Sequence, residues 1–311
     1  MKNHFKEEIL QGLKRPDKKL PSKYFYDAKG DALFQEIMRL DEYYLSQKEI
    51  EIFESQKAEI KKAICSDVPI RIIEIGAGDG SKTKILLRHF QESGVQFTYT
   101  PVDISKNVLD ILTRDLEKEI PGLKIESYQG DYFDALEKVS SSDEKDVIFF
   151  LGSTIGNFVR GEAETFLSKL NSFLKSKDML FMGVDLKKDP SVILSAYNDQ
   201  QGVTKAFNLN LLDRINAELD GTFDTSKFQH YPYYNPQTGE CRSYLISKVQ
   251  QKVMVAGEQF NFRPWEAIFM EVSKKYDEIQ LQELAKVSGF RPTQTFSDAR
   301  RWFADVLWEV A

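Results

Sequence analysis

The chain has 311 residues, 41% of them hydrophobic, and its 48 acidic and 42 basic side chains leave a formal net charge of −6. This size suffices for one large or two modest domains, and the acidic balance argues against a nucleic-acid-binding protein. Two cysteines and three histidines without ligand spacing exclude a disulfide framework and a zinc site, so we expect no metal. No segment reaches the about 18 to 20 apolar residues of a membrane span, and the N-terminus is polar. We therefore expect a cytoplasmic protein without membrane contact.

The first 60 residues show helical spacing of apolar side chains in two stretches. These stretches are marked by Leu33, Phe34, Ile37 and Met38, and then by Ile50, Phe53, Ile60 and Ile64.

A β-branched run at Ile70–Ile75 is followed by glycines 76, 78 and 80, in a G-x-G-x-G pattern. A dinucleotide fingerprint needs its last glycine one place later, where Ser81 stands. A zwitterionic cofactor such as S-adenosylmethionine needs only a glycine-lined turn, and Glu74 just upstream favours a cationic guest. The pattern therefore favours S-adenosylmethionine over a nicotinamide dinucleotide.

Strand-like and helix-like segments alternate from residue 70 to residue 186. The predicted strands are 70–75, 97–104, 124–128, 147–151 and 179–186, and the predicted helices are 82–90, 106–119 and 162–173. Five strands joined by helices imply an α/β fold with a parallel, doubly wound sheet.

Near the C-terminus, a helix is predicted over 279–288 with Gly289 as its stop, followed by strands over 290–296 and 302–310. These two strands are too close for a helical crossover, so they must pair antiparallel. Such an ending is usual for the Rossmann-like, mainly parallel sheet of class I methyltransferases. An antiparallel edge strand of any other doubly wound fold is the alternative.

Residues 188–275 interrupt the pattern, beginning with the helix start Asp189-Pro190 and continuing through a turn-rich region at 231–239 to strand-like residues 241–255. We expect 61–187 and 276–311 to form the cofactor-binding domain, and 1–60 with 188–275 to form a substrate-binding or lid domain.

Polar residues follow successive strands of the predicted sheet, where ligands of open α/β sheets bind. Asp103 ends the second strand and can accept both ribose hydroxyls of an adenosyl group, although a helix-capping role is about as consistent with its position. Asp131 and Tyr132 close the third strand, where they can bind and cover adenine. The loop from Gly152 to Asn157 follows the fourth strand, at the position facing the transferable group.

The chain resembles the histidine-specific Nα-methyltransferases of ergothioneine biosynthesis, which use S-adenosylmethionine to trimethylate the amino group of histidine and give hercynine. The matching segments, in family order, are Tyr26-Asp27 with Gly30; 40–44; 74–83; 152–157; Asp185-Leu186 with Lys188-Asp189-Pro190; 196–199; 206–208 with Asn210; and 271–273. They extend over nearly the whole chain.

The resemblance implies a role for each matching residue. Cofactor binding is implied for Tyr26, Gly76, Lys82, Asp103, Asp131 and Tyr132. Substrate binding is implied for Tyr43, Gly152, Asn157, Tyr197, Glu271 and Ser273, with Tyr26, Tyr43 and Asn157 nearest the chemistry. Glu271 and Ser273 alternate along a predicted strand, so they share a face and suit the two nitrogens of an imidazole.

Two positions depart from the family pattern. Ser243 stands where a hydrophobic residue, often Met, borders the substrate side chain, and Tyr132 stands where Phe is usual. The first departure leaves open an N-methyltransferase for another amino acid or amine. A nicotinamide-dependent oxidoreductase and a non-catalytic binder are further alternatives. We expect a monomer with a small amino-acid substrate.

Overall fold

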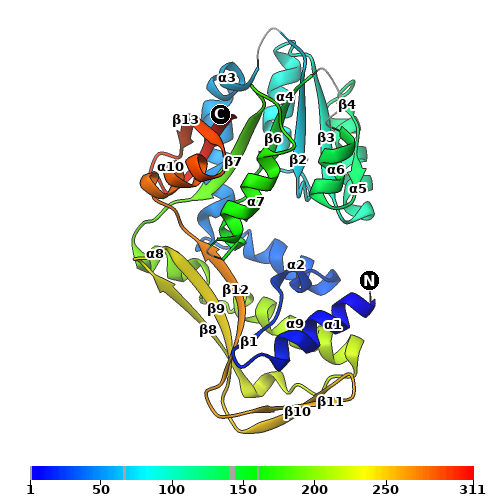
Figure 1. Ribbon diagram of the computed structural model, residues 1–311, viewed down its shortest axis with the longest axis vertical. Helices are drawn as coiled ribbons and strands as arrows, with labels where there is room; N and C mark the ends of the chain where they lie inside the picture. Colours follow the sequence, from blue (N-terminus) through cyan, green and yellow to red (C-terminus); the bar gives the residue numbers. More distant parts are fainter. Residues whose placement is uncertain (1, 66–67, 140–143, 160) are drawn as a thin grey trace. The chain divides into compact units, whose positions relative to one another are not determined.

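The computed structural model describes residues 2–65, 68–139, 144–159 and 161–311 as two compact units (Figure 1). Unit 1 consists of Met1–Tyr44 and Lys188–Lys274, and unit 2 of Leu45–Lys187 and Lys275–Ala311. The expected domain boundary at residue 60 thus falls inside helix α3 (Tyr44–Ile64), whereas the compact units divide at the start of that helix.

Unit 2 is built on a mainly parallel sheet with the strand order β13-β14-β7-β6-β2-β3-β4. The strands are β2 (Ile70–Ile75), β3 (Phe97–Asp103), β4 (Lys124–Ile125), β5 (Tyr128–Gln129), β6 (Lys145–Phe150), β7 (Met179–Asp185), β13 (Phe290–Ser297) and β14 (Phe303–Val310). Strand β14 pairs antiparallel with both β7 and β13. The predicted parallel sheet with a C-terminal antiparallel hairpin is therefore confirmed, and the single strand predicted at 124–128 is in fact two short strands on β3.

The helices of unit 2 follow the apolar spacing of the sequence, because each buries one apolar face. They are α3, α4 (Thr83–Glu92), α5 (Lys106–Glu119), α6 (Tyr132–Val139), α7 (Glu162–Asn171) and α10 (Glu278–Val287). Helix α5 has the predicted bounds. Gly289, the predicted stop of α10, lies two residues after the end of that helix and has a φ of 81°. Helix α6 was not predicted, and the buried side chains of Ala135 and Leu136 join it to the core of the sheet.

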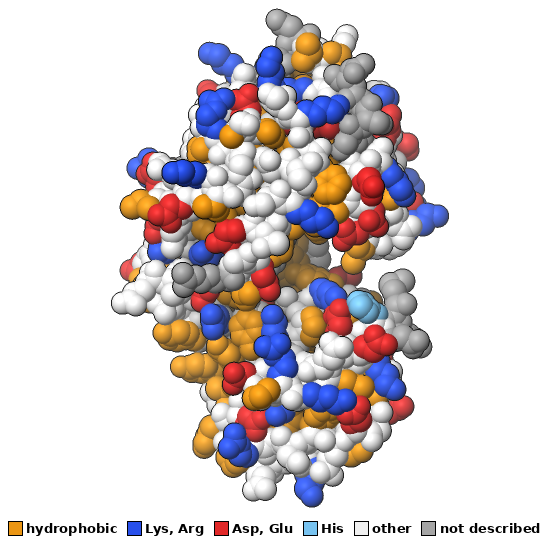
Figure 2. Space-filling view, in the orientation of Figure 1, with side chains coloured by type: hydrophobic (Ala, Val, Ile, Leu, Met, Phe, Trp, Pro, Cys, Tyr) orange, Lys and Arg blue, Asp and Glu red, His pale blue; other side chains and the backbone are white. Residues whose placement is uncertain are grey.

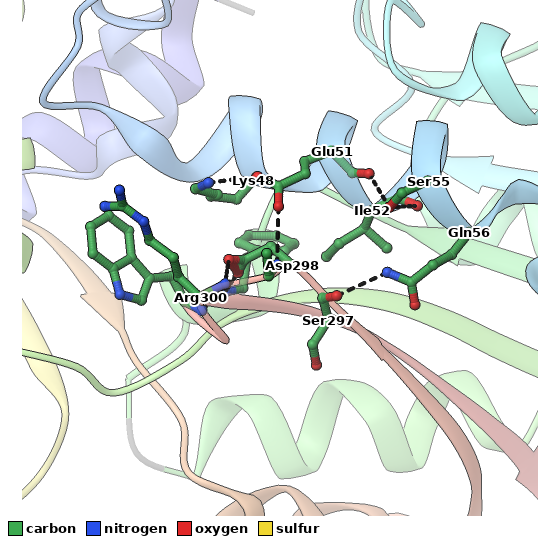
Figure 3. A network of polar contacts seen from close by, with 11 residues as sticks. Lys48, Glu51, Ile52, Ser55, Gln56, Ser297, Asp298 and Arg300 are labelled. Carbon is green, nitrogen blue, oxygen red and sulfur yellow. Dashed lines mark hydrogen bonds and ion pairs between the residues drawn. The ribbon is translucent and has the colours of Figure 1, made fainter.

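Helix α3 is fastened to the turn between β13 and β14 by a polar network (Figure 3). The Gln56 side chain donates to the Ser297 carbonyl at 2.9 Å, and Glu51 accepts from the Ala299 N–H at 3.0 Å. The turn itself is closed by Asp298, which accepts backbone N–H groups of the following residues, Phe303 among them. Ring contact between Phe53 and Phe181 of β7 adds apolar packing, so α3 belongs to the sheet unit.

Unit 1 contains a four-stranded sheet with the order β1-β12-β9-β8, a separate hairpin β10-β11, and helices. Its strands are β1 (Lys18–Lys19), β8 (Phe228–Asn235), β9 (Glu240–Ser247), β10 (Gln251–Val255), β11 (Glu258–Phe262) and β12 (Ala267–Lys274). Its helices are α1 (Lys2–Lys14), α2 (Ala28–Ile37), α8 (Pro190–Ala196) and α9 (Val203–Leu219). The predicted helix start holds, because Asp189 caps α8 and Pro190 is its first residue.

The turn-rich interpretation of residues 231–239 is wrong for its first half. Residues 231–235 belong to β8, and only 236–239 form the turn to β9. Pro232 is tolerated there because β8 is the edge strand of its sheet and has a partner strand on one side only.

Within the described ranges, no helix has the length and apolar content needed to cross a membrane. On the face drawn in Figure 2, lysine and arginine side chains are interspersed with acidic ones on each unit.

Candidate active site

The glycine turn after β2 adopts backbone conformations that favour glycine. Gly76, Gly78 and Gly80 have φ values of 75°, 54° and 61°. The Gly76 N–H donates to the Val102 carbonyl of β3 at 2.9 Å, and Gly80 is packed so closely that a Cβ there would lie 2.4 Å from Leu112 Cδ1. The third glycine of the pattern therefore lets helix α5 approach the turn, while a Cβ on Gly78 would meet no atom within 4 Å.

Glu74 does not face a guest, contrary to the sequence-based interpretation. Its side chain is buried, and its carboxylate accepts hydrogen bonds from Thr83 at 2.7 Å and from the Tyr99 hydroxyl. Burial raises the pKa of Glu74 to about 7, against the opposing hydrogen bonds of Tyr99 and Thr83. Glu74 thus ties the turn to the start of α4 and to β3.

The predicted cofactor residues after β3 and β5 come together beside this turn. The Gly130 N–H donates to the Asp103 carbonyl at 3.1 Å, and a Cβ on Gly76 would lie 3.1 Å from the Tyr132 hydroxyl oxygen. Burial, then the charges of Asp103 and Asp131, raise the pKa of Tyr132. Gly76, Asp103, Asp131 and Tyr132 therefore line one edge of the sheet.

Both acids of this group also shape the backbone. One oxygen of Asp103 accepts the Ser105 N–H at 2.9 Å, and one oxygen of Asp131 accepts the Phe133 N–H at 2.9 Å. Ser105, not Asp103, is the N-cap of α5, so the helix-capping alternative for Asp103 is wrong. In the described part of the chain, the hydrogen bonds to the Asp103 and Asp131 side chains engage one oxygen each, which leaves the other oxygen for a ligand. Half-buried Asp103 and exposed Asp131 suit the hydroxyl and amino donors of an adenosyl group.

The loop after β6 is held in an unusual conformation. Gly152 and Ser153 have consecutive positive φ values of 73° and 58°. The Ser153 hydroxyl accepts the Asp185 N–H of β7 at 3.0 Å, and a short 3-10 helix, η2 (Thr154–Asn157), follows. Gly152 and Asn157 are both exposed, at the two ends of this anchored loop.

Lys82 is paired with an acid that sequence reasoning missed. Its amino group forms an ion pair with Glu49 of α3, and that carboxylate also accepts the Gly152 N–H at 2.8 Å. Burial lowers the pKa of Lys82, but the neighbouring Glu49 outweighs it and raises that pKa overall. No local pattern marks Glu49, because its partners lie on other elements of unit 2.

In unit 1, an aromatic cluster connects two predicted tyrosines. The Tyr26 ring packs edge-on against Phe34 and Phe207, each with centroids 5.6 Å apart, and Phe34 packs against Tyr43 at 6.3 Å. Asp27 caps α2 by accepting the Gly30 N–H, and it also accepts the Asn210 side chain at 2.8 Å. The motif residues around Tyr26 therefore fix where this ring stands.

The predicted substrate residues of unit 1 also meet. The Tyr197 hydroxyl donates to Ser273 Oγ at 2.7 Å, and the Asn208 amide donates to Glu271 Oε1 at 3.4 Å. A β-bulge between Phe269 and Glu271 sets the register of β12, so that Glu271 stands directly opposite Ser243 of β9. Bulges of this kind change the direction of a side chain. Here the bulge places the Glu271 carboxylate opposite Ser243, the residue that differs from the family pattern.

Several buried polar atoms of unit 1 have no hydrogen-bond partner among the described residues. They include Ser243 Oγ, Asn208 Oδ1, Thr204 Oγ1 and His230 Nε2. Burial lowers the pKa of His230 to about 4, so its ring is neutral near pH 7. Because unpaired buried polar groups are unfavourable, Ser243 and Asn208 beside Glu271 indicate a polar ligand.

Some residues that carried the resemblance have structural roles instead. Asp185 forms a fully buried ion pair with Lys275 at 2.7 Å, which sequence reasoning also missed. Asp199 accepts the N–H groups of Val203 and Thr204, both at 2.8 Å, at the start of α9. These residues hold the elements that carry the site.

The predicted site residues thus form two groups. Unit 2 carries Gly76, Lys82, Asp103, Asp131, Tyr132, Gly152 and Asn157, and unit 1 carries Tyr26, Tyr43, Tyr197, Glu271 and Ser273. The sheet order and the glycine turn of unit 2 are those of an S-adenosylmethionine-binding, class I methyltransferase unit.

Comparison with known proteins identifies the family. The model of a family described as histidine-specific methyltransferase, S-adenosylmethionine-dependent, matches residues 5–310. The chain therefore belongs to the S-adenosylmethionine-dependent, histidine-specific methyltransferases.

Individual relatives agree with this assignment. The chain is 35% identical over 296 residues to the histidine N-alpha-methyltransferase of Mycolicibacterium smegmatis, covering 94% of this chain and 91% of that protein. It is 34% identical over 273 residues to the protein of the same name from Mycobacterium tuberculosis, covering 87% and 84%. It is 30% identical to ergothioneine biosynthesis protein 1 of Schizosaccharomyces pombe, covering 92% of this chain and 38% of that longer protein.

Proposed function

We propose that this enzyme transfers methyl groups from S-adenosylmethionine to the α-amino group of L-histidine until the trimethylated product, hercynine, is formed, a step toward ergothioneine. The observation that carries the proposal is the acid–hydroxyl set of unit 1. Glu271 stands opposite Ser243, and Ser273 lies on the same strand, bonded to Tyr197. A carboxylate and a hydroxyl of this kind can accept from and donate to the two nitrogens of an imidazole.

The residues of unit 2 fit the methyl donor. S-adenosylmethionine supplies a methyl group on a positively charged sulfur. Gly76 and Gly78 offer a surface without side chains, and the half-buried carboxylate of Asp103 can accept ribose hydroxyls. Asp131 can accept the adenine amino group, and the Tyr132 ring can cover the base.

The chemistry requires little from acid–base groups, because an amine attacks the methyl carbon with a free lone pair once the two are aligned. The chain's task is to keep the amine neutral and oriented. Asn157 can orient the amine, and Tyr26 or Tyr43 can accept hydrogen bonds from it or pass its proton to water. Each methyl group removes one N–H donor, so the carboxylate and imidazole anchors must retain the substrate between turnovers.

One observation favours a second substrate. Ser243 has a buried hydroxyl with no partner in the described part of the chain, at the position where the family has a hydrophobic residue. A different polar amino acid or amine that reaches this hydroxyl is therefore the alternative substrate.

Other parts of the proposal concern the whole protein. We expect it to act as a monomer in the cytoplasm. We also expect it to bind no nucleic acid, which the net charge of −6 and the mixed charge on the face in Figure 2 support. The single small-molecule substrate is an amino acid.

The test is a product analysis. Purified protein is incubated with S-adenosylmethionine and histidine, and mass spectrometry follows products heavier by one, two and three methyl groups. Other amino acids and simple amines are run in parallel at equal concentration. We expect trimethylated histidine as the end product. Release of only a monomethyl product would overturn the trimethylation, and preference for another amine would overturn the substrate.

A further inference from the structure

We propose that Glu49 is a positioning residue, which holds the Gly152 peptide and the Lys82 amino group in place for methyl transfer, and that Asp305 keeps a proton so that Glu49 can do so. The inference rests on the proposed function, because Gly152 and Lys82 are expected to contact substrate and cofactor.

The Glu49 side chain is completely buried, yet it contacts both of these residues. Its Oε1 accepts the Gly152 N–H at 2.8 Å, and its Oε2 pairs with the Lys82 amino group. Strand β7 leaves room for it at Gly183, where a Cβ would lie 2.2 Å from Glu49 Oε1. A Cβ on Gly152 would lie 3.2 Å from Lys82 Nζ, so the three groups are packed together.

The second carboxyl group of the cluster comes from β14, where Asp305 stands opposite Gly183 in the register with β7. Both Asp305 oxygens are buried, and neither has a hydrogen-bond partner among the described residues. A buried carboxyl group with no hydrogen-bond donor beside it keeps its proton, because the charged form would lose its solvation by water without compensation. Burial, then the charge of Glu49, raise the pKa of Asp305 well above its usual range, against the opposing charge of Lys82.

The charges of the cluster then balance. Glu49 forms an ion pair with Lys82, and a protonated Asp305 adds no charge to the cluster. Glu74 is the fourth titratable group, since its charge also acts on Lys82, and it is held by Tyr99 and Thr83. A buried cluster of this kind is stable only when its charges are paired and its donors are satisfied.

The peptide that Glu49 holds begins a strained loop. Ser153 has a φ of 58°, which costs a residue with a side chain free energy unless its surroundings enforce it. Two hydrogen bonds enforce this conformation. The preceding residue, Gly152, donates its N–H to Glu49, and the Ser153 hydroxyl itself accepts the Asp185 N–H. The loop leads to Asn157, so the carboxylate of Glu49 acts on the amine-orienting residue through the backbone.

Helix α3 gives Glu49 a firm base. The polar network of Figure 3 joins α3 to the loop after β13. Its members Glu51 and Gln56 follow Glu49 within the next two turns of the helix. Lys48 is ion-paired with Glu51 at 2.5 Å.

Three isosteric variants test the proposal: Glu49→Gln, Asp305→Asn and, as a matched control, Asp146→Asn. Asp146 is a buried carboxylate of the same unit, paired with Arg71 at 2.8 Å. Both Glu49 oxygens face donors, the Gly152 N–H and the Lys82 amino group. In Glu49→Gln, the side-chain NH₂ must face one of these donors, so kcat/KM for histidine should fall about 10- to 100-fold. In Asp305→Asn, a neutral amide replaces the neutral acid at nearly the same volume, so kcat/KM should stay within about threefold of the wild type. Asp146→Asn should lower Tm without changing kcat/KM.

The pH profile supplies a second measurement. At alkaline pH the wild type should lose kcat/KM as Asp305 gives up its proton, and Asp305→Asn should lack this loss. If Glu49→Gln does not fold, this comparison decides the question. The proposal is overturned if Glu49→Gln only lowers Tm like the control, or if Asp305→Asn is as inactive as Glu49→Gln.

Amide hydrogen exchange separates this proposal from the proposed function. Exchange at Gly152, followed in the wild type and in Glu49→Gln, needs no substrate. Faster exchange in the variant is expected, and equal exchange would overturn the role of Glu49. A wild type that methylates no histidine would overturn the proposed function, whatever the exchange result.

Discussion

Replacing Gly80 by alanine should destabilise unit 2 for two separable reasons. The first is the backbone, because a φ of 61° disfavours any residue with a Cβ by about 1 to 2 kcal/mol. The second is a clash, because the new Cβ would lie 2.4 Å from Leu112 Cδ1. Overpacking of this kind costs about 1 to 3 kcal/mol, since the leucine must leave its preferred rotamer. The expected loss of unfolding free energy is the sum, about 2 to 5 kcal/mol.

Gly78→Ala is the matched control. Gly78 has a φ of 54°, but a Cβ there would meet no atom within 4 Å. Its loss should be limited to the backbone part, about 1 to 2 kcal/mol. The change that alanine makes to the unfolded chain is the same in both variants, so it cancels in their difference.

Urea unfolding followed by circular dichroism measures both losses, and calorimetry with S-adenosylmethionine measures whether the turn still binds. Gly80→Ala should also weaken cofactor binding, because Leu112 and α5 must move away from the turn. Equal stability of the two variants would refute the argument that the third glycine is required by α5.

Four further predictions concern single side chains. Asp103→Ala should weaken S-adenosylmethionine binding in calorimetry by about 1.5 to 3 kcal/mol, through loss of hydrogen bonds to a charged acceptor, and should leave NAD unbound. Glu271→Ala should raise the KM for histidine sharply in steady-state assays and admit bulkier apolar amino acids, and an unchanged substrate profile would place the side-chain pocket elsewhere. Asn157→Ala should reduce transition-state stabilisation by roughly 2 to 4 kcal/mol, read from kcat/KM, while cofactor affinity changes little; near-normal trimethylation would contradict this role. The folded-state pKa of Glu74 is about 7, above its ordinary value of 4.5, so ionisation opposes folding and stability is lost as pH rises from about 4.5 through 7. Glu74→Gln should therefore gain stability relative to the wild type between pH 5 and 8, and a constant difference in urea unfolding across that range would refute the assignment.

Much of unit 2 could be predicted from the sequence, because the relevant signals are local. The run Ile70–Ile75 is a strand with the predicted bounds, and glycines directly after it form the turn. The short spacing between β13 and β14 left only an antiparallel pairing, and this pairing is present. Strand propensity, turn chemistry and connection length all act over a few residues, so a single sequence contains them.

The alternation of Glu271 and Ser273 was also readable, but their environment was not. Only the bulge at residue 270 and the register with β9 put Glu271 opposite Ser243. Only the tertiary fold brought the hydroxyl of Tyr197, at the end of α8, to Ser273. Pairing register depends on both strands at once, so no pattern within β12 specifies it.

The tertiary structure alone decided which acids serve the site. Glu74 stands beside the glycine turn in the sequence, yet it is buried against Thr83 and Tyr99. Glu49 lies 103 residues before Gly152, in a helix whose apolar spacing says nothing of its role, yet it holds the peptide of that glycine. A buried charge is placed by the partners that neutralise it, and those partners meet only when distant segments fold onto one sheet.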